Sequence, residues 1–507
     1  MDDNVLTDIP WITTTEGKKT IEETLLLSHV EGFNISKDQE GFFYGAQMRI
    51  LAQVTALAIR NADRHTDDIL DDGFSQETLN KTFEQLDEGA HLRSGKYPYM
   101  QWPLDTVSQE KGKKPVTKLL PTVTSDAAYG FWDLHAMPNE LDPSETALWV
   151  TVWGMYSMTG NTKISGKKPE NFTPAFRLSP KHVPTEVIYE GDSLIETLIR
   201  HIDPAMLEEP KGLPAWADRT GEKSNSKARM SRLWKATWTS NACILHWNGD
   251  SDSSVVQHVE IGGIPENWCP LPIKGNEKEW SDSRDQEDFF YCYKTHEYKG
   301  NTTRKLNYFP LDQNATELAV TWTTANIYQP NRISISTGKN VTPVLIQHRV
   351  EGTATSPSIR ASRVTTTDPK TWVVAGNTDP DVVRNVKMLA EYVNDVRGCL
   401  EKAMQKRKDL ESQKGYVFDE EFTPIRRDVL ETFWNNLEQT YRKAALSFEE
   451  GEEFDQNIQR DIKNLTVATF KDVTQPLQFT NPRKVFQATK RLQTLLNNLN
   501  KKENSNE

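Results

Sequence analysis

The sequence predicts an α+β protein in which a large mixed N-terminal globular domain, residues 1–379, is followed by a C-terminal antiparallel four-helix bundle, residues 380–507. Two observations lead to this prediction. The last third of the chain holds four amphipathic segments joined by short connections, which is typical of an antiparallel bundle. The part before it mixes clear helix signals with short β-branched runs, which is typical of an α+β body.

Two long helices are predicted in the N-terminal domain, over 43–62 and 142–157. The first carries apolar residues at helical spacing around Leu51. The second opens with Asp142-Pro143-Ser144-Glu145, which supplies an N-cap, a proline at the first helical position and a carboxylate at the third. Three β-branched runs bounded by Pro, Gly or Asn are predicted as strands: Glu317 to Trp322, Arg332 to Ser336 and Val341 to His348.

The bundle is predicted from apolar residues that recur every three or four positions. The first helix starts near Asp381, the second at Thr423-Pro424, the third near Phe454 and the fourth at Asn481-Pro482. From 380 to 507 there are 21 Lys or Arg and 21 Asp or Glu, so the bundle is neutral. We expect it to pack against neighbouring proteins.

Charge and composition limit the possible functions. The 507 residues include 60 Lys or Arg and 72 Asp or Glu, a net charge of −12 that excludes a uniformly basic nucleic-acid coat. The acidic N-terminus does not resemble a secretory signal, and apolar stretches are interrupted before the roughly 18 residues of a membrane span. We therefore expect a cytoplasmic protein with reduced thiols and no membrane partner.

Gly191-Asp192-Ser193-Leu194 matches the string of a serine hydrolase family, in which the serine needs a histidine and an acid. No later histidine has an aspartate three residues before it. Ser193 and Glu196 also form a capping box that opens an apolar helix, and this interpretation explains more of the sequence. A hydrolase that uses Ser193 is the alternative function.

The pairs Cys243/His246 and Cys292/His296 allow a structural zinc site as a second alternative. Residues three apart on a strand point to opposite faces, however, and Ala242 to Trp247 is typical of a strand. The sequence lacks a phosphate-binding loop and a zinc-protease motif. We expect no catalytic residue, no metal and no other cofactor.

An ordered series of segments resembles the CasA family, the large subunits of the type I-E CRISPR surveillance complex Cascade. The segments that carry the resemblance are Asp8 to Ile12, Tyr97 to Gln101, Lys118 to Leu120, Thr122 to Phe131, Leu141 to Ala147, Gly191 to Leu198 and Leu213 to Trp216. The order and spacing of the segments, together with the bundle, cover nearly the whole chain. The part from 240 to 375 matches least.

The resemblance implies a non-enzymatic subunit of a crRNA-guided complex. Members of that family recognise the short PAM duplex beside the target, open the duplex so that the guide RNA pairs, and recruit a helicase-nuclease. The implied partners are the backbone, small and crRNA-end-binding subunits, the crRNA, double-stranded target DNA and the effector nuclease. A scaffold with no nucleic-acid role is the third interpretation.

The same resemblance implies sites. Tyr129 and Phe131 correspond to a loop that anchors the subunit at the crRNA end. Lys163, Gly166, Lys167 and Lys168 lie in a stretch similar to a glycine-rich loop that reads the minor groove, and glycine lets a backbone approach DNA closely. Lys274 or Lys278 corresponds to a minor-groove lysine.

The duplex-opening wedge differs from that of well-known relatives, which carry glutamine at a hairpin tip. The comparable stretch here contains Ser356-Pro357, followed by Arg360 and Arg363. Proline stiffens a tip and its apolar ring can intrude between base pairs. In the bundle, Lys402, Lys406 and Arg407 are expected to line the displaced DNA strand, while other faces contact the small subunits.

Overall fold

The computed structural model describes residues 3–101, 112–122, 137–156, 183–209, 211–225, 230–239, 241–249, 254–263, 288–298, 301–325, 327–328, 341–353, 356–368, 371, 379–405 and 420–503. These residues form two compact units. The first comprises Met1–Leu311 and Ile327–Thr366, and the second comprises Asp312–Asn326 and Thr367–Glu507. The chain therefore passes from the first unit to the second, returns, and then stays in the second.

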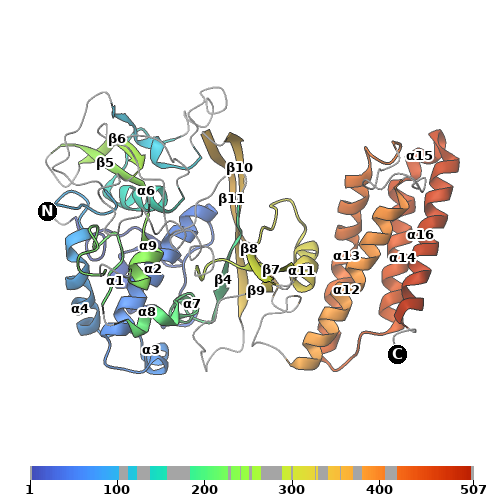
Figure 1. Ribbon diagram of the computed structural model, residues 1–507, viewed down its shortest axis with the longest axis horizontal. Helices are drawn as coiled ribbons and strands as arrows, with labels where there is room; N and C mark the ends of the chain where they lie inside the picture. Colours follow the sequence, from blue (N-terminus) through green and yellow to red (C-terminus); the bar gives the residue numbers. More distant parts are fainter. Residues whose placement is uncertain are drawn as a thin grey trace. The chain divides into compact units, whose positions relative to one another are not determined.

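Helix α2, Gly41–Asn61, is the central helix of the first unit (Figure 1). It packs against α4, α6 and α7, and nearly all of its apolar side chains are buried. Among the described residues it is the one helix long and apolar enough for a membrane span, but 78% of that window is buried in the protein, as expected of a core helix. The other helices of this unit are α1 Ile21–Leu26, α3 Thr66–Asp72, α4 Gln76–Leu86, η1 Asp87–Gly89, η3 Val116–Leu119, α6 Pro143–Tyr156, α7 Leu194–Ile199, α8 Pro204–Glu208 and α9 Arg232–Thr237.

Small antiparallel sheets complete the described part of the first unit. Their strand orders are β1-β2, β11-β10-β4, β3-β6-β5 and β8-β7-β9. The strands are β1 Ile12–Thr14, β2 Gly17–Lys19, β3 Lys114–Pro115, β4 Glu186–Glu190, β5 Asn241–Asn248, β6 Val255–Gly263, β7 Tyr293–Tyr298, β8 Asn301–Leu306, β9 Ile327–Tyr328, β10 Thr342–Thr353 and β11 Ser356–Thr366. The predicted strand at Val341 to His348 is confirmed as the first part of β10, and Arg332 to Ser336 lies outside the described residues.

Local capping signals in the sequence are confirmed at two helices. At α6 the backbone N–H of Glu145 donates to Asp142 Oδ1 over 2.7 Å, and the Glu145 carboxylate accepts from the N–H of Asp142. At α7 the backbone N–H of Glu196 donates to Ser193 Oγ over 3.4 Å. Both helices then bury the apolar faces that their spacing predicts.

Four long helices of the second unit form a bundle in which α12 packs on α13, α14 and α16, and α14 also packs on α13 and α16. The predicted seam of α12 is buried, from Val386 through Leu400. The helices of this unit are α11 Ala315–Thr324, α12 Pro380–Ala403, α13 Arg426–Glu449, α14 Gln456–Val473, α15 Gln475–Thr480 and α16 Pro482–Glu503. The predicted α+β class with a helical C-terminal region is confirmed.

Two local predictions are wrong. Residues 317–322 form part of helix α11 and not a strand, because the Asn314 side chain caps the helix and its apolar side packs on α12 and α13. Helix α13 begins at Arg426, and Thr423-Pro424 lies in the turn before it. In the first case tertiary packing outweighed the β-propensity of Val, Thr and Trp.

A close approach at Gly45 of α2 gives a test of the core. A Cβ atom on Gly45 would lie 2.0 Å from Tyr156 Oη, whereas one on Gly398 of α12 would meet no atom within 4 Å. Gly45→Ala is expected to reduce stability by about 1–3 kcal/mol through overpacking. Gly398→Ala, the matched control, is expected to raise it by about 0.5–1 kcal/mol through helix propensity. Thermal unfolding of both variants measures this, and equal shifts of the same sign would contradict the packing.

Candidate nucleic-acid interface

The β10–β11 hairpin extends beyond the strand that supports it (Figure 1). Strand β4 pairs only with Thr342 to Ile346 of β10, so the rest of the hairpin has no third strand in the described sheet. At the far end Thr353 pairs with Ser356 and Gly352 pairs with Pro357. Residues 354 and 355 join the two strands and lie outside the described residues.

The register shows where Ser356 and Pro357 lie in the hairpin. Ser356 and Pro357 are the first residues of β11 and lie opposite β10, so the connecting residues precede them. Pro357 is tolerated because β11 is an edge strand and its missing N–H costs no internal ladder bond. Its partner Gly352 has φ +105°, a conformation that favours glycine.

A β-bulge directs the charges of the outer hairpin. The register shifts between Arg349 and Val350, which leaves Arg360 as the extra residue on β11. A bulge increases the local twist and changes the direction of a side chain. Glu351 lies 3.2 Å from Arg349 Nε and 3.7 Å from Arg360 Nε, so one carboxylate lies between two guanidinium groups. Arg349 was not among the predicted site residues, although a charged residue directly after His348 in a predicted strand was a signal for a residue on the opposite face.

Arg363 lies nearer the base of the hairpin and is already held by the protein. Its Nη2 donates to the carbonyl of Leu311 over 3.0 Å, and its Nε donates to Thr365 Oγ1 over 3.0 Å. These bonds tie β11 to the segment after β8. Arg363 therefore supports the hairpin, whereas Arg349 and Arg360 lie on its outer part.

The outer hairpin also contacts the basic segment 112–122. The backbone N–H of Ile359 donates to the carbonyl of Pro121 over 3.0 Å. This segment carries Lys113, Lys114 and Lys118, and partial burial together with the charge of Lys114 lowers the pKa of Lys118. The predicted anchor loop begins directly after it, at Thr122. Sequence reasoning treated the hairpin and this loop as separate features.

The base of the hairpin contacts the N-terminus of α2. A Cβ atom on Gly41 would lie 2.7 Å from both Ile346 Cγ2 and Ser362 Oγ, so glycine is what allows the sheet to approach the helix. The backbone N–H of Phe42 donates to Ser362 Oγ over 2.9 Å. A serine on the hairpin thus satisfies a helix N-terminus 320 residues away in the sequence.

Behind this contact lies a buried network of charges. Arg49 of α2 donates to Glu186 of β4 over 2.9 Å and to Asp288 over 2.8 Å. Tyr156 Oη donates to Glu186 over 2.7 Å, and His348 Nε2 lies 3.6 Å from the same carboxylate. Burial opposes ionisation of Glu186, but Arg49, with help from His348 and Tyr156, lowers its pKa to about 2.

Ser362, His348 and Glu186 follow one another as in a hydrolase relay, since Ser362 Oγ lies 2.9 Å from His348 Nδ1. His348 and Glu186 are fully buried, however, and Ser362 Oγ accepts the N–H of Phe42. A nucleophile needs access to substrate, so this network is structural.

The serine and zinc alternatives gain no support from the described residues. Ser193 caps α7, and the nearby His201 makes its hydrogen bonds with backbone groups of Thr197, Val187 and Tyr189. Cys243 is buried against the carbonyl of Met100. The described part of the chain contains no cluster of three His, Cys, Asp or Glu suited to a metal.

Most residues implied by the resemblance lie outside the described residues. These are Tyr129, Phe131, Lys163, Gly166, Lys167, Lys168, Lys274, Lys278, Lys406 and Arg407. Lys402 is described and lies exposed in the last turn of α12.

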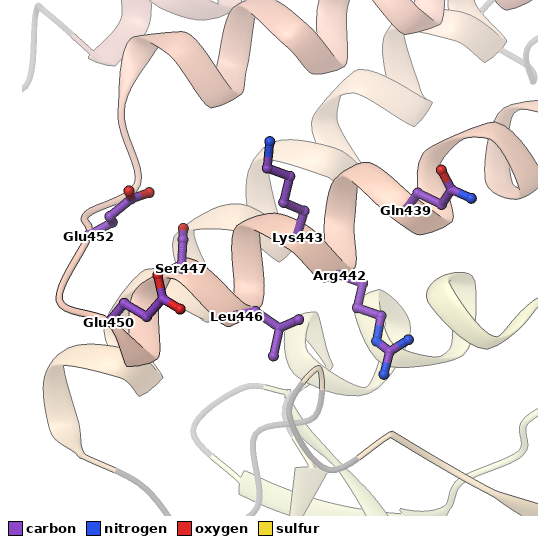
Figure 2. A pocket seen from close by; sticks show the side chains of 7 residues that line it. All are labelled: Gln439, Arg442, Lys443, Leu446, Ser447, Glu450 and Glu452. Carbon is purple, nitrogen blue, oxygen red and sulfur yellow. The ribbon is translucent and has the colours of Figure 1, made fainter.

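A hollow of about 470 Å³ lies on α13 and the turn after it (Figure 2). Arg442 and Lys443 point away from each other there, and Glu450 and Glu452 supply opposing charge. Arg442 Nε lies 3.0 Å from Asp368 Oδ2. This mixed and internally paired lining does not single out an anionic or cationic ligand.

Comparisons with known proteins connect this geometry to a family. The profile of CRISPR-associated protein Cse1 (CRISPR_cse1) matches residues 5–278. Cse1 from Acidimicrobium ferrooxidans is 15% identical, with a TM-score of 0.64 over 97% of this chain and 98% of that one. CasA (Cse1) of Thermus thermophilus is 16% identical, with a TM-score of 0.64 over 98% and 100%.

A chain of a structure described as a CRISPR RNA-guided surveillance complex is 17% identical, with a TM-score of 0.68 over 97% of this chain and 99% of that one. The comparison with curated proteins gave no match. At these identities the solved structures establish the shared fold.

The buried network predicts a specific response to acid. The lowered pKa of Glu186 means that its contribution to stability is complete above its unfolded pKa of about 4.5 and is lost as the pH falls toward 2. Glu186→Gln should therefore lower the free energy of unfolding at pH 7. At pH 3 the difference in this free energy between variant and wild type should be smaller by about 2 kcal/mol. Urea unfolding at both pH values measures the deficit. Glu88→Gln, at an exposed ion pair with Lys223, should show no such narrowing; a constant deficit for Glu186→Gln would contradict the network.

Proposed function

Because this chain belongs to the CRISPR-associated Cse1 family, whose profile spans more than half of it, we propose that it is the large subunit of a type I-E CRISPR surveillance complex. In this role it recognises the PAM in double-stranded DNA, opens the neighbouring base pairs so that the crRNA pairs with its target, and helps recruit a helicase-nuclease. Its partners are the crRNA, the target duplex and the backbone, small and crRNA-end-binding subunits. It acts in antiviral defence in the cytoplasm and performs no catalysis itself.

The observation that supports this proposal most strongly is the hairpin with a clamped base and an extended outer part. Exchange of a DNA duplex for an RNA–DNA duplex is nearly balanced in free energy. A protein element that contributes a few kcal/mol to unstacking therefore decides where opening begins. A wedge must be held rigidly from behind, and the contacts of Gly41, Ser362 and Arg363 hold the base of this one.

The remaining sites follow from the same proposal. Tyr129 and Phe131 anchor the subunit at the crRNA end, in a loop that starts where Ile359 of the hairpin bonds to Pro121. Lys163, Gly166, Lys167 and Lys168, with Lys274 or Lys278, contact the PAM duplex together with Arg360. In the bundle, Lys402, Lys406 and Arg407 line the displaced strand, and other faces contact the small subunits.

Shortening the hairpin tests the wedge. Glu351 and Ser358 face each other, so residues 352–357 can be replaced by Asn-Gly, a two-residue turn that preserves the strands below it. In the reconstituted complex this variant should bind a PAM-bearing duplex about 10- to 100-fold more weakly. A target with two or three mismatched base pairs beside the PAM should restore binding of the shortened variant, because these base pairs are already open and need no wedge.

Its control replaces only residues 354 and 355 by Asn-Gly and keeps the hairpin length. Electrophoretic mobility shift of both complexes on matched and pre-opened targets gives the comparison. An equal loss on both targets would mean that the hairpin contributes affinity without opening the duplex.

A second test concerns the lysines beside Gly166. If Lys167 and Lys168 contact phosphates, their double alanine variant should reduce the slope of log K against log salt by about 1.8, or about 0.9 for each contact. Lys18 and Lys19, another adjacent pair, serve as the control substitution. Target binding of the complex is measured at several salt concentrations, and an unaltered slope would remove these lysines from the interface.

A further inference from the structure

Two phenylalanines on the bundle are exposed where folding gives no reason for them. Phe479 of α15 is 86% exposed and Phe486 of α16 is 69% exposed. The buried stripe of α16 runs through Val485, Ala488 and Leu492, so Phe486 lies outside it. The two helices contact each other, and large aromatic side chains exposed on adjoining elements indicate an interaction site.

The charged residues that flank these rings in the sequence have one sign. Residues 473–502 contain six Lys or Arg and no Asp or Glu, whereas residues 380–472 contain 15 basic and 19 acidic residues. The neutral bundle therefore divides into an acidic part and a cationic one. The exposed cations of residues 473–502 therefore favour a polyanion.

Two of these cations are exposed on the same helix as Phe486. Arg483, Phe486 and Lys490 follow at intervals of three and four residues, which places them on one face of α16. Neither Arg483 nor Lys490 forms an ion pair within the described part of the chain. By contrast, Arg491 donates to the carbonyl of Gln405, and Lys484 lies 4.0 Å from Glu421, so these two stabilise the bundle.

The neighbours of the two rings favour nucleic acid over a protein partner. Apart from Pro476 and Pro482, the exposed positions between and beside them are polar or cationic: Gln475, Gln478, Thr480, Arg483, Gln487 and Lys490. A protein interface usually surrounds its aromatic anchors with further apolar area. Separate aromatic rings set among cations are the arrangement that binds single strands, with bases on the rings and phosphates on the cations.

We propose that Phe479, Phe486, Arg483 and Lys490 form a binding surface for single-stranded nucleic acid, which we call the α15–α16 surface. It adds to the proposed function a second surface for the displaced strand, on residues that nothing in the family resemblance singled out. The surface needs no guide and no PAM.

Binding of the purified full chain to a fluorescently labelled 20-nucleotide thymidine oligonucleotide tests this proposal. Anisotropy should show that Phe479→Leu/Phe486→Leu weakens binding about 10-fold or more, since leucine keeps the apolar character but removes the ring. Phe479→Tyr/Phe486→Tyr should bind as wild type does. Arg483→Gln/Lys490→Gln should lower the salt slope by about 1.4, or about 0.7 for each phosphate contact.

Lys387→Gln/Met388→Ala is the matched control, because it changes an exposed cation and an exposed apolar residue on α12. It should leave binding unchanged. Wild-type binding by the leucine variant would overturn the proposal, and so would a leucine variant that loses association with other subunits while it still binds the oligonucleotide. This assay does not measure PAM-dependent duplex binding. A negative result here therefore does not contradict the hairpin proposal, and a negative result in the hairpin test does not contradict this one.

Discussion

The ion pair between Arg49 and Glu186 is the constraint on which the arrangement of the first unit depends. Removing two charges from water costs several kcal/mol for each ion, and only good geometry with further hydrogen bonds offsets this. The required groups come from α2, β4, α6 and the segment before β7. The sheet that carries the hairpin therefore has a defined position on α2, since any other position leaves a buried charge unpaired.

Because the base of the hairpin is held in place, its far end points in a defined direction. Close contact at Gly41 and the Ser362–Phe42 hydrogen bond hold β10 and β11 against the helix N-terminus. Beyond β4 the two strands support each other, and the bulge at Arg360 sets their twist. The bond from Ile359 to Pro121 then ties the outer part to the segment that leads into residues 123–136. The hairpin thus contacts the segment that directly precedes the proposed crRNA anchor.

Local sequence signals predicted the elements but not their contacts. Helix caps and apolar spacing depend on residues within one or two turns, so they can be predicted from the sequence. Examples are the caps at Asp142 and Ser193 and the apolar spacing of α12. Helix α11 was missed because its strand-like composition is outweighed by packing on two other helices. The partnership of Phe42 with Ser362 has no local signature at all.

The candidate site shows the same limit. The family resemblance matched the stretch with Ser356-Pro357 to a hairpin tip. The pairing of Gly352 with Pro357 moved the connection two residues back, because register is set by the whole ladder and by burial of one face. The positive charge of residues 473–502 is visible in the sequence. The exposure of Phe479 and Phe486, which indicates where a ligand would bind, is visible only in the structure.

Charge placement explains how an acidic protein suits contact with nucleic acid. At the hairpin one glutamate lies between two arginines and offsets part of their positive charge. A weakly cationic surface attracts duplex DNA without sequence preference, which would suit the proposed role of a subunit that leaves specificity to base pairing. Within the described part of the chain, Arg483 and Lys490 of the α15–α16 surface have no such neutralising partner. On the proposed α15–α16 surface this unbalanced charge is available to the phosphates of a single strand.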